Sequence, residues 1–164
     1  MPLNAYLTIK GQKQGVIKGG VTEKGREGSI LVHAFDNAIL SPRDPASGLP
    51  TGKRTHEPVT IVKEVDSSTP LLWNALVNNE NLTQWQLDFW STNPTQGAAE
   101  KLIYSVSLIN AGIASIHEFM DDNQVPAQAT LPLQNEITFV YQKIEWTWTV
   151  GGITASDDWE TPNV

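Results

Sequence analysis

The chain has 164 residues, of which 40% are hydrophobic and 18% charged, a composition typical of a folded domain and not of a disordered chain. Its formal net charge of −7 disfavours phosphate-bearing partners, so neither nucleic-acid binding nor binding to an anionic membrane surface is expected, and membrane insertion is not expected either, for want of an apolar segment. The absence of cysteine excludes disulfides and thiolate chemistry, and no apolar run approaches the ~20 residues of a membrane span. We therefore expect one domain over residues 1–164.

Alternation of apolar and polar residues predicts several half-buried strands. In chain order, the apolar positions are Ala5, Leu7 and Ile9; Val59, Ile61 and Val65; Trp85, Leu87 and Phe89; and Leu102, Tyr104, Val106 and Leu108. The stretch from Ile30 to Phe35 is β-prone throughout, and Lys63 interrupts the apolar face of its strand. These patterns indicate a mostly β protein.

A long turn-rich segment separates two of these strands. It runs from Ser41 to Gly52 and contains Pro42, Pro45 and Pro50. Connections of this length are uncommon in a compact domain and are usually functional or disordered. A connector without a role is the alternative.

One segment has a helical pattern, from Pro70 to about Asn79. Proline is tolerated in the first turn of a helix, and Ser68 or Thr69 could cap the free amides before it. The apolar residues of this segment have helical spacing, which predicts a helix that packs against a sheet by one side. They are Leu72, Ala75 and Leu76.

The last long strand, from Glu136 to Val150, changes its apolar face midway. A one-residue shift reverses every side chain, so a bulge or bend is expected near Gln142. Val150 to Ile153 contains two glycines and reads as a hairpin turn. Together, the patterns predict a small closed β-barrel of two packed sheets, with one flanking α-helix and a long extended loop.

Residues suited to catalysis or metal binding are few. His56 with Glu57, or His33 with Asp36, could hold a metal, and His117 lies on a third predicted strand, but no pair has the spacing of a known site. Glycoside hydrolysis needs two carboxylates across a cleft, but adjacent strand residues point in opposite directions, so the aspartate pairs at 121–122 and 157–158 cannot flank one substrate bond. In a chain of this charge they are interpreted as solvated loop acids. No nucleophile elbow, phosphate loop or dinucleotide motif is present. We expect no catalytic, cofactor or metal site.

Six tryptophans are many for a chain of this length. Trp85, Trp146 and Trp148 lie on predicted strands and are expected in the core. The other three are harder to bury together and are candidate interface aromatics. They are Trp73, Trp90 and Trp159. Exposed aromatics could equally stack on sugars, so a sugar- or ligand-binding β-barrel remains the alternative, and a small metal-dependent hydrolase a third hypothesis.

Four segments, taken in order, resemble the Hcp family (hemolysin-coregulated protein), the tube proteins of bacterial type VI secretion systems. They are Pro2–Gly15, Gly52–Pro58 continuing through Val62–Leu72 to Ala75 and Leu76, Tyr141–Trp148, and Asp157–Trp159. The resemblance implies a β-barrel with a flanking helix, assembled as a homohexameric ring. It also implies that rings stack into a tube, that a contractile sheath fires the tube, and that small effectors travel in the lumen.

The expected partners are therefore copies of this chain and the sheath, spike and effector proteins of the system. The expected localisation is cytoplasmic during assembly, followed by secretion without a cleavable signal peptide, since residues 1–13 lack the pattern of one. In the family, an extended loop at the place of Ser41–Gly52 reaches neighbouring subunits and rings. Its candidate contact residues here are Pro42, Arg43, Asp44, Pro45, Pro50 and Lys53.

Overall fold

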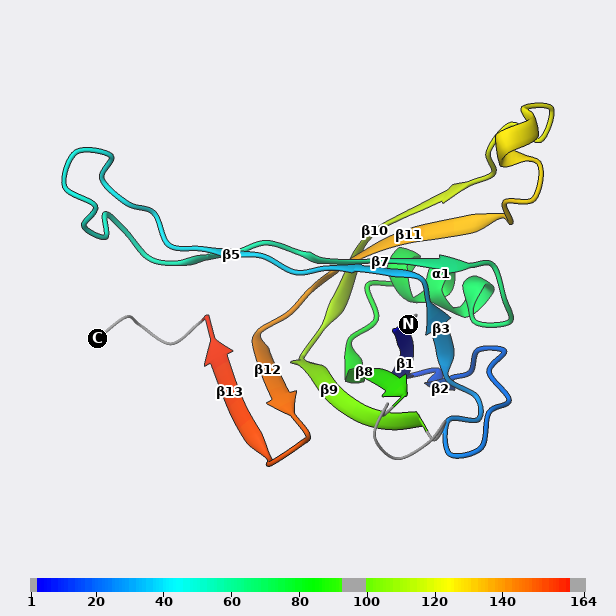
Figure 1. The fold of residues 1–164 in the computed structure, drawn as a ribbon, viewed down its shortest axis with the longest axis horizontal. Helices are drawn as coiled ribbons and strands as arrows, with labels where there is room; N and C mark the ends of the chain where they lie inside the picture. The colour runs from blue at the N-terminus through cyan, green and yellow to red at the C-terminus, as the bar shows by residue number, and fades with distance from the viewer. Residues whose placement is uncertain (1–2, 93–99, 160–164) are drawn as a thin grey trace.

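The computed structural model describes residues 3–92 and 100–159 (Figure 1). Its strands are β1 (Asn4–Gly11), β2 (Gly15–Ile17), β3 (Ile30–Val32), β4 (Ala34–Asp36), β5 (Ile39–Leu40), β6 (Thr55–His56), β7 (Val59–Glu64), β8 (Leu82–Thr92), β9 (Glu100–Ile109), β10 (Gly112–Phe119), β11 (Gln134–Val140), β12 (Lys143–Trp148) and β13 (Ile153–Asp158). Its helices are α1 (Thr69–Val77) and the short 3-10 helix η1 (Pro126–Gln128). The expected mostly β fold with one α-helix is confirmed.

The strands form three antiparallel sheets. The largest has seven strands in the order β13-β12-β9-β8-β1-β2, with β3 also paired to β1. The second has the order β10-β11-β7-β4, and the third contains only β5 and β6. Within the described ranges these pairings leave each sheet open, so the expected closure into a barrel is not confirmed.

The chain passes between the two larger sheets at sharp corners. One lies between β9 and β10, where Asn110 adopts a positive φ of 52°. Another separates β11 from β12 at Tyr141 and Gln142, which confirms the predicted break near Gln142. The side-chain amide of Asn110 donates a 2.8 Å hydrogen bond to Oε1 of Gln142, so the two corners stabilise each other.

The hydrophobic core draws on both larger sheets. The predicted apolar positions on β1 and β8 are buried, as are Val59 and Ile61 on β7. The rings of Trp85 and Phe139, one from each sheet, meet edge to face with centroids 5.4 Å apart. The strand alternation in the sequence therefore identified most of the core. Of the three tryptophans expected there, Trp85 is buried and Trp146 is half-buried against the core. The expectation is wrong for Trp148, which is 45% exposed.

Lys63 is the main exception to the expected pattern. The sequence suggested that it interrupts the apolar face of its strand, with Val65 continuing that face. Instead, Lys63 is fully buried and Val65 is 37% exposed. The Lys63 ammonium donates to the carbonyl of Glu64 at 2.8 Å and to the Thr69 hydroxyl at 3.1 Å, and it lies 3.1 Å from Oδ1 of Asp66. These polar partners offset the free-energy cost of burying the charge. Burial nevertheless lowers the pKa of the Lys63 ammonium group.

Helix α1 begins one residue before Pro70 and ends at Val77. Its buried side chains include Leu72 and Ala75, as the predicted stripe requires. Ser68 occupies the N-cap position, but its side chain does not cap the helix. Its hydroxyl instead donates a hydrogen bond to Asp66 in the preceding turn.

Candidate functional site

The predicted long loop is an ordered hairpin that projects from the body of the molecule (Figure 1). We call residues 39–56, which include β5 and β6, the arm. Beyond β5 and β6, the two sides stay paired through hydrogen bonds from the Thr51 amide to the Pro42 carbonyl at 3.0 Å and from the Asp44 amide to the Leu49 carbonyl at 2.9 Å. The segment is therefore a hairpin whose two sides are hydrogen-bonded to each other along its length.

The tip of the arm is organised by Asp44. Its carboxylate accepts hydrogen bonds from the Ser47 hydroxyl at 2.7 Å and from the Ala46 amide at 3.1 Å, and these bonds lower the pKa of Asp44. The turn closes at Gly48, whose φ of 74° favours glycine. Asp44, predicted as a contact residue, thus also holds the turn in shape.

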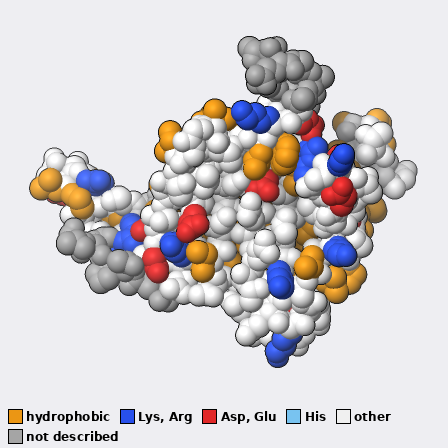
Figure 2. Space-filling model, turned by 90° about the horizontal axis from the view of Figure 1, so that it is seen from below, with side chains coloured by type: hydrophobic (Ala, Val, Ile, Leu, Met, Phe, Trp, Pro, Cys, Tyr) orange, Lys and Arg blue, Asp and Glu red, His pale blue; other side chains and the backbone are white. Residues whose placement is uncertain are grey.

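The arm exposes cations next to apolar side chains. Arg43 and Lys53 are exposed, and so are Leu40 and Leu49, which are 53% and 64% accessible. Among the predicted proline positions, Pro45 and Pro50 are exposed and Pro42 is half-buried. Figure 2 shows hydrophobic and basic side chains together on the arm, which projects at the left.

A partly buried polar cluster fastens the root of the arm to the C-terminal strand. We call it the arm-base cluster; it consists of Arg54, His56, Tyr141, Asp157 and Trp159. The His56 ring lies 2.8 Å from the Tyr141 hydroxyl through Nδ1 and 2.6 Å from Asp157 Oδ2 through Nε2. Arg54 donates from Nε to the same Asp157 oxygen at 2.5 Å and from Nη2 to the Asp158 carbonyl at 2.8 Å.

Trp159 completes the arm-base cluster from the far end of β13. Its indole Nε1 donates to the Tyr141 carbonyl at 2.6 Å, and its ring lies 5.5 Å from the His56 ring, centroid to centroid. Asp157 was expected to be a solvated loop acid; that interpretation is wrong, because β13 returns beside the arm and supplies the carboxylate to Arg54 and His56.

The arm-base cluster has clear electrostatic consequences. The hydrogen bond from Arg54, with further help from His56, lowers the pKa of Asp157. Burial, together with the nearby negative charge of Asp157, raises the pKa of Tyr141 to about 12. The cavity beside His56 measures only about 20 Å³, room for roughly one water. The cluster is thus built to join segments of chain and offers no space for a substrate.

The other histidines lie elsewhere. His33 is 3.3 Å from Oε1 of Glu64, and His117 stacks on Phe119 with centroids 5.4 Å apart. In the part of the chain that the structure describes, no three His, Cys, Asp or Glu side chains gather as a metal site would require.

The candidate interface tryptophans have different surroundings. Trp73 is half-buried on α1, and Trp159 is 37% exposed although it belongs to the arm-base cluster. Trp90 packs within its own chain: the Arg26 guanidinium carbon lies 4.4 Å from the Trp90 ring centroid and 4.7 Å from that of Tyr6. Trp90 and Tyr6 therefore form an intramolecular stack with Arg26. Arg26 also forms an ion pair with Glu100 at 2.5 Å.

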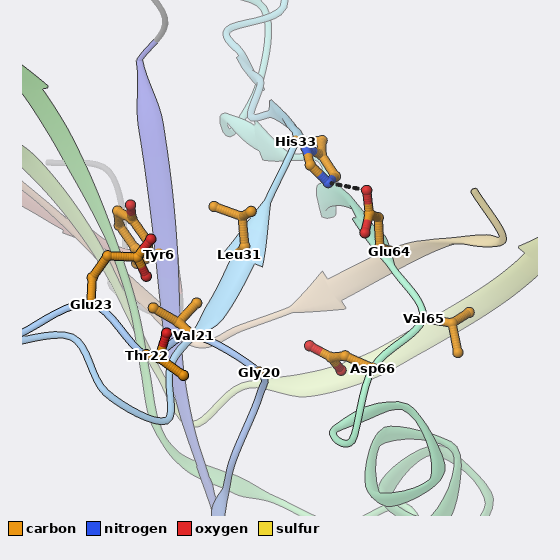
Figure 3. Close-up of a pocket in the computed structure, with 10 residues that line it drawn as sticks. All are labelled: Tyr6, Gly20, Val21, Thr22, Glu23, Leu31, His33, Glu64, Val65 and Asp66. Atoms are coloured by element: carbon orange, nitrogen blue, oxygen red, sulfur yellow. Dashed lines mark ion pairs between the residues drawn. The ribbon is translucent and has the colours of Figure 1, made fainter. Parts of the chain in front are cut away.

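A pocket of about 260 Å³ opens at the end of the molecule opposite the arm (Figure 3). Figure 3 shows Glu23 and Leu31 on one side of it and Glu64 and Asp66 on the other. No pattern in the sequence indicated this pocket, because its walls come from β1, β3, the loop after β2 and the end of β7.

The chain is similar to known proteins over most of its length. A model of the family described as "Type VI secretion system effector, Hcp" matches residues 6–148. The "Major exported protein" of Pseudomonas aeruginosa is 36% identical over 171 residues, covering 99% of this chain and 98% of that protein. No helix among residues 3–92 and 100–159 is long and apolar enough to cross a membrane.

Solved structures show the same fold. A crystal structure of an Hcp protein aligns with a TM-score of 0.88 at 26% identity, covering 98% of this chain and all of the other. The secreted protein Hcp3 from Pseudomonas aeruginosa aligns with a TM-score of 0.79 at 28% identity, covering 98% of this chain and 100% of that one. The family-model match and the full-length identity show that this chain belongs to the Hcp family of type VI secretion proteins.

Proposed function

We propose that this chain is a structural subunit of the type VI secretion inner tube, a single Hcp-like domain without a catalytic role. Copies of it assemble into homohexameric rings, the rings stack and are exported, and the lumen carries small effectors. The subunits assemble in the cytoplasm and are then exported. Family membership supports this proposal, as do relatives whose names describe exported and secreted proteins.

The observation that carries the proposal is the projecting arm. A hairpin that extends from the body with exposed leucines and cations is suited to contact another protein. Its root is held by the arm-base cluster, so less conformational entropy is lost when the arm docks than a flexible loop would lose. The proposed contact residues are Pro42, Arg43, Asp44, Pro45, Pro50 and Lys53.

Further copies of the chain are the first proposed partners, and the sheath, spike and effector proteins follow. Trp73 and Trp159 remain proposed interface aromatics. For Trp90 the proposal is narrower, since Arg26 already packs over its ring. Trp90 would have to contact a partner by the surface that Arg26 leaves accessible.

The test replaces Pro42–Pro50 by a short Gly-Ser turn. We expect the thermal unfolding midpoint to stay near that of the parent protein, because β5, β6 and the arm-base cluster remain. Rings and tubes in negative-stain electron micrographs, and release into the medium, should decrease strongly. A Gly-Ser replacement of residues 122–124, in the exposed β10–β11 connection, serves as the control for altering a surface loop.

Normal tubes and normal release from the shortened variant would contradict the role of the arm. Light scattering on the parent protein tests the oligomer itself. A monomer at high micromolar concentration would contradict the proposed ring.

A further inference from the structure

The pocket in Figure 3 combines an apolar surface with carboxylates. Leu31, on β3, is 39% exposed in it. Glu23 and Glu64 are exposed on its two sides, and Asp66 lies beside Glu64. A complementary ligand would therefore present an apolar side chain next to a cation.

The tip of the arm presents that combination. Leu49 is 64% exposed. Arg43 stands across the hairpin from it, since Arg43 forms a β-bridge with Pro50, the next residue. The Arg43 guanidinium donates a long hydrogen bond of 3.4 Å to the Gly48 carbonyl at the tip, and the side chain is exposed.

The arm cannot reach the pocket of its own chain. It projects at one end of the long axis, whereas β3 lies toward the other end (Figure 1). The arm-base cluster also fixes the root of the arm against β13, through contacts of Arg54 and His56 with Asp157. An arm that enters this pocket therefore belongs to a second copy.

We infer that the arm tip of one copy docks in the pocket of a second copy, with Leu49 against Leu31 and Arg43 beside Glu23 and Glu64. This inference rests on the proposed assembly and names the surface that receives the arm. The two contacting surfaces differ, so the interface is head-to-tail and propagates from copy to copy. The protein has a net charge of −7, so two copies repel each other on average. A contact between Arg43 and the two glutamates is favoured over other contacts because its charges are opposite.

The absence of native cysteine permits a direct test. In the double variant Leu49→Cys with Leu31→Cys, mild oxidation of the assembled protein should give a ladder of disulfide-linked chains on a non-reducing gel. The matched control pairs Leu49→Cys with Val77→Cys, which is 70% exposed on α1 and outside the pocket, and should give no ladder. Disulfides require Cβ atoms within about 4.5 Å, so the ladder reports contact and not mere proximity.

Charge reversal provides a second and independent measurement. Arg43→Glu, or Glu23→Arg with Glu64→Arg, should raise the protein concentration needed for half-maximal assembly about tenfold. Combining all three changes should bring that concentration back toward the parent value. Glu136→Arg, at an exposed position on β11, is the control and should assemble like the parent. Thermal melting verifies that each variant is folded.

The possible outcomes separate the inference from the function on which it rests. If the parent protein forms rings but the cysteine pair gives no ladder, or no more than the control pair, the inference is wrong and the proposed function stands. If the parent remains monomeric, both are wrong. Rings that form equally well with Arg43→Glu would also overturn the docking.

Discussion

His56, on the return side of the arm, lies 2.6 Å through Nε2 from Oδ2 of Asp157, although 101 residues separate them in the sequence. The same carboxylate oxygen accepts a hydrogen bond from Arg54. One acid near the end of the chain therefore holds two residues at the root of the arm. Any motion of the arm relative to β13 must break these contacts.

Asp157→Asn should destabilise the fold and loosen β13. The change removes the negative charge that faces Arg54 and His56, and hydrogen bonds to charged groups contribute about 1–3 kcal/mol each. Both partners are partly shielded from solvent, with side-chain exposures of 18% for Arg54 and 28% for Asp157. Urea unfolding should show a lower free energy of unfolding, and hydrogen exchange of the backbone amides in β13 should become faster. Glu136→Gln, an exposed acid on β11, should leave both unchanged.

The same carboxylate predicts how stability depends on pH. Its pKa is lower in the folded protein than the ordinary value of about 3.9 expected when the chain is unfolded. Its contribution is therefore fully present above about pH 5 and disappears as the pH falls through the lowered folded pKa. Asp157→Asn should flatten the acid limb of the stability curve. An unchanged acid limb in the variant would show that other groups govern acid unfolding.

Arg26 and Trp90 should be energetically coupled. A guanidinium over an indole ring contributes about 1 kcal/mol at a partly shielded site, and the Arg26 carbon lies 4.4 Å from the Trp90 centroid. A double-mutant cycle with Arg26→Ala and Trp90→Ala measures this coupling by chemical denaturation. Trp90→Phe should retain part of it. Additive effects of the two alanine changes would mean that the stacked geometry contributes nothing.

Neighbouring glycines should respond differently to alanine. A Cβ at Gly19 would lie 2.5 Å from the Ser29 carbonyl oxygen and 2.8 Å from the Ile30 Cα, so backbone must move. We expect Gly19→Ala to lower the free energy of unfolding by about 1–3 kcal/mol. At Gly20 nothing lies within 4 Å of the added atom, and Gly20→Ala should be neutral or slightly stabilising. Equal thermal midpoints for the two variants would contradict this account.

Lys63→Met should be strongly destabilising. Removing one partner of a buried ion pair costs about 3 kcal/mol, because Asp66 and Thr69 would lose their buried donor. Lys101→Met, at an exposed position on β9, is the matched control and should change stability little. Denaturant titration of both variants tests the difference. A small effect at Lys63 would mean that the methionine side chain compensates by packing.

Local patterns in the sequence determined much of the fold. Strand alternation placed Leu7, Ile9, Trp85 and Leu87 in the core because side chains on a strand alternate between two faces. The change of face near Gln142 marked a corner between sheets for the same reason. The order of the family-like segments also indicated the family that the comparisons then showed. These features depend on neighbouring residues or on their order along the chain.

The tertiary structure alone decided the arm-base cluster, the environment of Lys63 and the pocket around Leu31. Asp157 looks like a solvated acid in the sequence and becomes an ion-pair partner only because β13 returns beside the arm. Lys63 looks like an interruption, yet Asp66 and Thr69 from the next turn supply its polar contacts. Such pairings depend on how strands from distant parts of the chain are placed, and no local periodicity encodes that placement.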